Sequence, residues 1–247
     1  SEGSLYEVDM RLRPSGNTGP ISTSLKSFSQ YQVKSAWTWE HMALTRARII
    51  YSTSNHFCNQ VQDVIKAALV QKRDLKKLLC DVAEMRTRIA KEKPVSSLWV
   101  LKRIRGGIID IEFIAQFLLL KKAFSHPRIL EPVSSEQIGL SDIIKRLSWA
   151  GYLDSKEAIA LTKALKLYNA LQSVIGLNVS TNIMLKNAKN FPEALKRNLA
   201  GIVKCESFEA LEAIIRKNAS RVYAIFVKYI ESPANNIKDA KHSKAPE

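Results

Sequence analysis

Apolar residues recur at the spacing of an α-helix through almost the whole sequence after Pro20, and this pattern limits the fold more than any other feature. The stretch Ile108 to Ala123 is apolar on nearly all sides, which predicts a central, buried helix. Only Leu5 to Arg13 alternates between apolar and polar residues with the two-residue period of a β-strand that has one buried face. We therefore expect a mainly α fold, in which a helical bundle follows a single strand.

The pattern divides the chain into three parts. Residues 1–20 hold the strand and a turn rich in Pro, Gly and Ser, and residues 21–230 form the helical bundle. Residues 231–247 are polar and contain two Pro residues, so we expect a flexible tail there. Helices are predicted near residues 25–31, 37–47, 57–68, 74–90, 108–123, 135–150, 154–175 and 207–230, with a linker at 91–107 and a broken helical stretch up to residue 200.

Composition limits the size and the partners. The 247 residues, 46% of them apolar, are enough for one globular domain with its own core. Lys and Arg outnumber Asp and Glu by 38 to 23, and the net charge of +15 favours nucleotides, nucleic acid, an acidic protein or a membrane surface as partners. No apolar run is long enough to span a bilayer. The chain opens without Met and reaches strand-like sequence within four residues, which suggests a fragment or a processed chain.

Residues that commonly carry metal or nucleophilic chemistry are sparse. Cys58, Cys80 and Cys205 are odd in number and far apart, so neither a disulfide framework nor a four-cysteine zinc site is predicted, and a reducing cytoplasm fits best. The four His residues lack metal-ligand spacing. The Gly-rich phosphate loop, the dinucleotide fingerprint, the H-E-x-x-H helix and the G-x-S-x-G turn are absent, which removes the enzyme classes that these motifs define.

One charged face stands out on the predicted strand. Asp9, Arg11 and Arg13 point the same way if residues 5–13 are extended. A carboxylate flanked by guanidinium groups suits a site that handles Mg²⁺ and a polyphosphate, because the Asp binds the hard cation and the Arg side chains bind phosphate oxygens. The alternative is a salt-bridged strand face without catalytic function, which composition alone favours.

A second segment carries two tryptophans in the order Trp-Thr-Trp-Glu-His at positions 37–41. Two residues that are two positions apart on a helix diverge by about 200°, so Trp37 and Trp39 are not expected to form one stacking platform. For each of them singly we favour a place in the core. The alternative is that one of them covers a groove.

A third segment places polar residues inside the most apolar helix. Glu112 and Gln116 are one turn apart on one face, while Asp110 points elsewhere, so Asp110 and Glu112 do not form a metal pair. Polar groups buried here need partners, because an unsatisfied one costs about 1–3 kcal/mol. A structural network and a functional site remain equal alternatives for Asp110, Glu112 and Gln116. The basic segment that ends at Gly107, before the helix, could also bind an anion.

The three segments, in this order, resemble the glutamine synthetase adenylyltransferase family, whose members are bifunctional adenylylating and deadenylylating enzymes. The residues that carry the resemblance organise about the first half of the chain, and the wording of the second segment resembles the carboxy-terminal, adenylylating unit. From Ser134 onward the match is loose. The matching stretches read LYEVDMRLRPSGNTG, YQVKSAWTWEHMALTRARII, DVAEMRTRIAKEK and GGIIDIEFIAQFLLL.

The resemblance implies a fold and an activity. The strand would be the last one of a truncated nucleotidyltransferase sheet of the polymerase-β type, followed by the bundle. The implied activity is transfer of AMP from ATP to a tyrosine of glutamine synthetase, which regulates nitrogen assimilation. Asp9 matches the third carboxylate ligand of two Mg²⁺ ions, and Arg11 and Arg13 would orient the site or meet phosphate. Asp110, Glu112 and Gln116 match the family's helical motif, whose role is functional or architectural.

The resemblance also implies what this chain lacks. In the family a Gly-Ser turn and the Asp-x-Asp pair that supplies the other Mg²⁺ ligands should precede Asp9. This chain begins only eight residues before Asp9, so we expect it to lack them and to be inactive alone. The alternative function is a non-catalytic helical module that docks glutamine synthetase or a PII-type signalling protein. A nucleic-acid-binding domain is a third reading, supported only by the charge, because no recognition-helix pattern is present.

Overall fold

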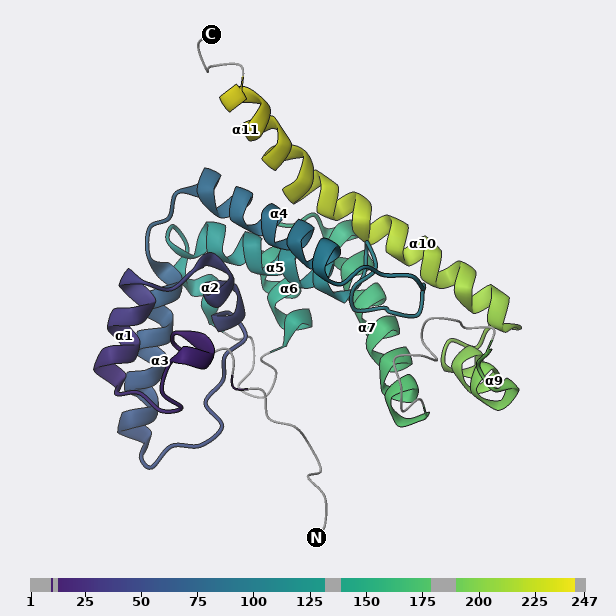
Figure 1. Ribbon diagram of the computed structural model, residues 1–247, viewed down its shortest axis with the longest axis horizontal. Helices are drawn as coiled ribbons and strands as arrows, with labels where there is room; N and C mark the ends of the chain where they lie inside the picture. Colours follow the sequence, from purple (N-terminus) through teal and green to yellow (C-terminus); the bar gives the residue numbers. More distant parts are fainter. Residues whose placement is uncertain (1–9, 11–12, 132–138, 179–189, 243–247) are drawn as a thin grey trace.

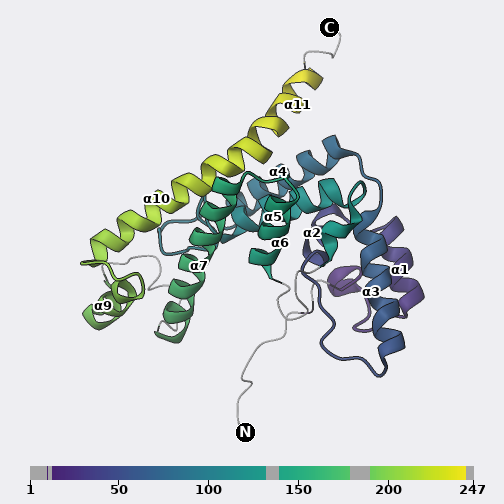
Figure 2. The ribbon, with the colours of Figure 1, turned by 180° about the vertical axis from the view of Figure 1, so that it is seen from behind.

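A computed structural model describes residue 10 and residues 13–131, 139–178 and 190–242. These residues form helices joined by short loops, and no β-strand occurs among them, which confirms the expected mainly α fold. The predicted strand at 5–13 lies outside the described residues except for its positions 10 and 13. Figures 1 and 2 place α1, α2 and α3 at one end of the molecule and α9 at the opposite end.

The first helices begin where short polar side chains cap them. Ser24 Oγ accepts a hydrogen bond from the Ser27 N–H, Ser54 Oγ accepts one from Phe57, and Asp74 accepts from the N–H groups of Lys76 and Lys77. Such caps satisfy backbone donors that have no partner inside the helix. The capped helices and the short one between them are α1 (Leu25–Lys34), α2 (Thr38–Leu44), α3 (Asn55–Val70) and α4 (Leu75–Glu92).

Helix α5 (Ile108–Ala123) is the centre of the core, as predicted. It packs against α2, α3, α4, α6, α7 and α10, so its neighbours surround it (Figure 1). The three consecutive residues Leu118, Leu119 and Leu120 are each at most 2% exposed, which an amphipathic surface helix cannot achieve. The apolar character of this segment on all sides therefore reflects burial on all sides.

The second half of the chain encloses the other side of α5. It consists of η2 (Pro127–Leu130), α6 (Leu140–Trp149), α7 (Ser155–Asn178), α9 (Glu193–Ile202) and α10 (Phe208–Phe226). Helix α10 packs on α5, α7 and α9, and it runs along one side of the molecule (Figures 1 and 2).

The prediction of a flexible tail at 231–247 was wrong for residues 231–242. A π-helical segment, η4 (Val227–Glu231), continues α10 into α11 (Ser232–His242), which packs on α4. Ala234 is 1% exposed, and Lys238 pairs with Glu84 at 3.1 Å. Pro233 indicated a break, but it directly follows the π segment, where the regular α-helical hydrogen-bond ladder is already interrupted.

Candidate functional site

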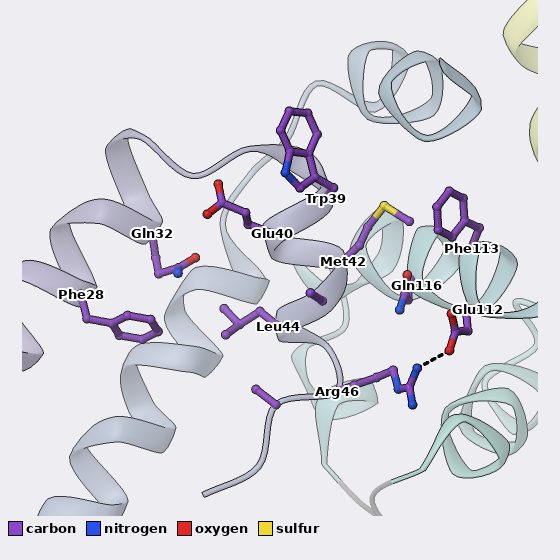
Figure 3. A pocket seen from close by; sticks show the side chains of 12 residues that line it. Phe28, Gln32, Trp39, Glu40, Met42, Leu44, Arg46, Glu112, Phe113 and Gln116 are labelled. Carbon is purple, nitrogen blue, oxygen red and sulfur yellow. Dashed lines mark hydrogen bonds and ion pairs between the residues drawn. The ribbon is translucent and has the colours of Figure 1, made fainter. Parts of the chain in front are cut away.

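A hollow of about 530 Å³ lies between α1, α2 and α5, and we call it the amide pocket (Figure 3). Its wall combines aromatic and aliphatic side chains with a few polar groups, which is the usual composition of a small-molecule site. The lining residues are Phe28, Gln32, Trp39, Glu40, Met42, Ala43, Leu44, Arg46, Ala47, Glu112, Phe113 and Gln116.

Glu112 and Gln116 both line the amide pocket, as their one-turn spacing predicted. Glu112 accepts a hydrogen bond from Arg46, which lies in the turn after α2, and Figure 3 marks this ion pair. The Arg46 side chain is 46% exposed and that of Glu112 is 18% exposed, so solvent screens the pair. The pair joins α2 to α5 across the pocket. Arg46 lies in the matching stretch that begins at Tyr31, but the sequence analysis gave it no role.

Two amide side chains in the amide pocket lack partners among the described residues. Gln32 and Gln116 are each 6% exposed. The Gln32 Oε1 is fully buried and accepts no hydrogen bond from the described chain. The Gln116 amide, which is not among the fully buried unpaired atoms, lines the pocket without a bond to a described residue. An unpaired buried polar atom costs about 1–3 kcal/mol, so the Gln32 Oε1 is available to water or to a polar ligand, and the Gln116 amide faces the same pocket. Gln32 lies in the matching stretch that begins at Tyr31, but the sequence analysis gave it no role.

The tryptophan segment forms the start of α2 rather than part of the core. Trp37 precedes the helix with extended backbone at φ −81° and ψ 161°, and its indole stacks on that of Trp39 with the ring centres 4.9 Å apart. The prediction that the two rings cannot stack was wrong, because only Trp39 is inside the helix. The core prediction was also wrong, since Trp37 is 59% exposed and Trp39 is half-buried in the wall of the amide pocket.

Glu40 holds this segment in place. Its carboxylate accepts the Trp37 N–H at 2.8 Å and the Tyr31 hydroxyl at 2.7 Å. Burial and the bond to Glu40 raise the pKa of Tyr31, while a backbone hydrogen bond with Ser15 opposes that rise. The turn that contains Ser15 therefore contacts α1 next to the amide pocket.

His41 is a structural residue at the junction of α1, α2 and α4. Its Nε2 is 2.9 Å from the Gln32 carbonyl oxygen, and its Nδ1 is 3.3 Å from Arg73 Nη2. Burial lowers the pKa of His41, and the charge of Arg73 lowers it further. Burial also lowers the pKa of Arg73 to about 10. At neutral pH the imidazole is therefore uncharged, donates to Gln32 and accepts from Arg73.

Asp110 belongs to a buried network on the other side of α5. It forms an ion pair with Arg86, and the two side chains are 0% and 1% exposed. The Gly106 N–H donates to Asp110 Oδ2 at 2.5 Å, and the Tyr168 hydroxyl donates to the Gly106 carbonyl at 3.1 Å. Burial raises the pKa of Asp110, and the Arg86 partner opposes that rise. The network fixes the loop before α5 and leaves Asp110 no access to a ligand.

Gly106 is required by this arrangement. Its φ of +77° suits glycine, and a Cβ here would lie 1.8 Å from the carbonyl oxygen of Ala219 in α10. The Gly106 N–H donates its hydrogen bond to the Asp110 carboxylate. The backbone at the start of α5 is therefore not the anion site that the Gly-Gly segment suggested.

The strand residues are only partly covered by the structure. Asp9 and Arg11 lie outside the described residues. The Arg13 guanidinium donates to the carbonyl oxygens of Met10 at 2.8 Å, Gly19 at 3.1 Å and Asn17 at 3.4 Å. Three of its five donors therefore stabilise its own turn.

Neither a metal cluster nor a membrane-spanning helix occurs in the described part of the chain. No three His, Cys, Asp or Glu side chains there come together in a way that could hold a metal ion. No helix there is long and apolar enough to cross a membrane.

The sequence profile of the glutamate-ammonia ligase adenylyltransferase family matches residues 1–63. A bifunctional glutamine synthetase adenylyltransferase/adenylyl-removing enzyme of Bradyrhizobium sp. is 44% identical over 229 residues, which cover 93% of this chain and 22% of that protein. By sequence, the chain belongs to this family. The enzymes of the same name from Bradyrhizobium diazoefficiens and Xanthobacter autotrophicus are 43% and 39% identical over 235 and 232 residues, or 94% of this chain in each case.

The family match extends through both halves of the chain, including the second half, where the motif resemblance was loose. The chain spans about 22% of the length of these relatives. The part of the family sequence that this chain matches therefore carries both the amide pocket and the Asp110 network.

Proposed function

We propose that this chain is part of an enzyme that transfers AMP from ATP to a tyrosine of glutamine synthetase. The observation that carries the proposal is the 39–44% identity, over more than 90% of the chain, to proteins named glutamine synthetase adenylyltransferase/adenylyl-removing enzyme. The three unpaired cysteines, Cys58, Cys80 and Cys205, support placing the enzyme in the reducing cytoplasm.

In this proposal, Asp9 is a Mg²⁺ ligand and Arg11 contacts the phosphates of ATP. Arg13 holds the turn after the strand, in line with its three bonds to backbone carbonyls. That turn contacts Tyr31, whose hydroxyl donates to Glu40 in the wall of the amide pocket. The contact supports a catalytic strand that ends close to the amide pocket, so the helical bundle would position the strand.

We further propose that this chain alone does not transfer AMP. Residues 1–8 contain no Asp-x-Asp pair, and the described residues contain no group that could hold a metal ion. In-line phosphoryl transfer with two metal ions needs several carboxylate ligands, and Asp9 is only one. The residues present therefore do not fit a complete Mg²⁺ site, and no catalytic step through the metal is assigned to this chain.

Asp9→Asn in a full-length adenylyltransferase that carries this sequence tests the proposal. We expect AMP incorporation into glutamine synthetase to fall by about 100-fold or more, because the variant loses a metal ligand. The matched control is Asp63→Asn on the exposed face of α3, which should leave the rate unchanged. A full rate in Asp9→Asn would disprove the assignment, and AMP transfer by the 247-residue chain alone would disprove its proposed inactivity.

Docking is the second candidate function, and exposed aromatic residues favour it. Trp149 at the end of α6 is 70% exposed and Phe124 after α5 is 56% exposed, although large aromatic residues are more often buried. The proposed partners are glutamine synthetase and a PII-type signalling protein, with no role for membrane or nucleic acid. Binding of the chain to either protein, measured by calorimetry and weakened by Trp149→Ser, would support docking, and no binding would contradict it.

A further inference from the structure

A second hollow, of about 450 Å³, lies between the end of α4, the loop before α5, and α10. Four arginines and two serines give it its polar character, and no carboxylate of the described chain lines it. We call it the arginine hollow and define its polar residues as Arg86, Arg103, Arg105, Arg216, Ser96 and Ser97.

Arg86 is tightly paired with a carboxylate, whereas the other three arginines have only a more distant carboxylate partner or none among the described residues. Arg86 is buried and paired with Asp110. No described residue bonds to the Arg103 guanidinium, which is half-buried. Arg105 and Arg216 are each 3.8 Å from a carboxylate oxygen, of Glu231 and Glu212 respectively, beyond the length of a good hydrogen bond.

Those two carboxylates have better partners elsewhere. Glu231 accepts the Tyr223 hydroxyl at 3.2 Å, and Glu212 accepts the Trp99 indole N–H at 2.8 Å. The tryptophan is 2% exposed, so this bond holds Glu212 toward the core. The guanidinium groups of the arginine hollow therefore keep donors for a ligand.

The backbone that carries Arg103 and Arg105 is fixed before any ligand arrives. Arg86 Nη2 donates to the carbonyl oxygens of Arg103 at 3.1 Å and Ile104 at 3.2 Å. Arg105 lies over the Tyr223 ring, with 5.5 Å between its Cζ and the ring centre. Preorganised donors lose little conformational entropy on binding, which favours a specific site over a diffuse positive surface.

Serine hydroxyls add neutral donors to the arginine hollow. Ser97 Oγ accepts the Trp99 N–H at 3.2 Å, which leaves its own proton free to donate. Ser96 is exposed at the rim and has no side-chain partner among the described residues.

We infer that the arginine hollow binds the phosphoryl group of a small molecule, either inorganic or organic. Guanidinium groups bind phosphate oxygens through pairs of parallel N–H donors, and a phosphoryl group accepts several such bonds at once. The volume of the hollow lies within the usual range for small ligands, so it can admit a group attached to the phosphate. The inference does not depend on the proposed adenylyl transfer, because no residue that lines the hollow belongs to the predicted strand at 5–13.

The test is calorimetry on the 247-residue chain in about 0.15 M salt, an ionic strength at which long-range attraction is screened. The probes are pyrophosphate, AMP, and adenosine as the control without phosphate. We expect saturable binding of pyrophosphate or AMP and no binding of adenosine. Pyrophosphate alone would indicate an inorganic ligand, and AMP binding more tightly than pyrophosphate would indicate an organic one.

The variant for this test is the double substitution Arg103→Gln and Arg216→Gln. Both side chains are at least partly exposed, so folding should persist, and circular dichroism checks it. We expect affinity for the phosphate probe to fall by about tenfold or more. Arg221→Gln, an exposed position on α10 outside the hollow, should change it less than about twofold.

Equal loss in Arg221→Gln and in the double variant would overturn the inference, because it would indicate attraction to net charge alone. Absence of saturable binding by both probes would also overturn it. Asp9→Asn should leave the phosphate affinity unchanged. A loss of affinity in that variant would place the ligand at the catalytic strand instead, so failure of this inference is distinguishable from failure of the proposed function.

Discussion

The two sides of α5 use polar residues in opposite ways. On one side, Asp110 is completely buried, and Arg86 and the Gly106 N–H satisfy its carboxylate. On the other side, Gln116 is almost as buried, yet its amide has no partner in the described part of the chain and faces the amide pocket. Two positions six residues apart in one motif therefore differ in role. The satisfied group stabilises the fold, whereas the unsatisfied group is available to a ligand.

The largest expected effect comes from removing the ion pair of Asp110 with Arg86. Asp110→Asn should lower the free energy of unfolding by about 3–5 kcal/mol, because it leaves the Arg86 charge buried without a counter-charge. Urea denaturation followed by circular dichroism measures this loss. The double variant Arg86→Met with Asp110→Leu removes both charges and should lose less than Asp110→Asn alone. A loss below about 1 kcal/mol in Asp110→Asn would show that the network is not what fixes the loop.

A smaller effect concerns pH and the junction beside the amide pocket. Burial lowers the pKa of His41 in the folded chain, so the His41 side chain binds a proton more readily in the unfolded chain. The free energy of unfolding therefore decreases as the pH falls below about 6.5. The loss should level off once the pH is below the folded pKa. His41→Gln should reduce the difference in unfolding free energy between pH 7 and pH 5 by about 1 kcal/mol. His56→Gln, at an exposed position of α3, is the matched control and should behave like the parent chain.

The smallest expected effect concerns Gln116 in the amide pocket. Gln116→Leu should change the free energy of unfolding by less than about 1 kcal/mol, and in the stabilising direction, because the substitution removes an amide that has no partner. Thermal and urea denaturation measure it. A loss above about 2 kcal/mol would mean that the Gln116 amide is satisfied in solution, and the contrast with Asp110 would then fail.

Much of the helical architecture was predictable from local pattern. The period of apolar residues located α3, α4, α5, α7 and α10 to within a few residues, because amphipathic periodicity depends on neighbours three and four positions away. The same rule separated Asp110 from Glu112 and Gln116 correctly. The prediction of a flexible tail failed because a polar sequence with two Pro residues, Pro233 among them, was interpreted as unable to form a helix. The π segment that precedes Pro233 follows from no local pattern used in the sequence analysis.

The residues that complete the amide pocket and the arginine hollow could not be predicted in the same way. Arg46 is 66 positions from Glu112, and Arg216 is more than a hundred positions from Arg103. The stack of Trp37 on Trp39 depends on where α2 begins, a difference of one residue that periodicity does not fix.

The sequence by itself determined the helical class, the buried central helix and the membership of the adenylyltransferase family. Only the tertiary structure decided which polar groups are satisfied, how α11 packs on α4, and where Arg103, Arg105 and Arg216 converge. The physical reason is the distance along the sequence between the residues that interact. Helix formation depends on residues within one or two turns, whereas satisfaction of a buried polar group depends on side chains that the fold brings together from distant positions.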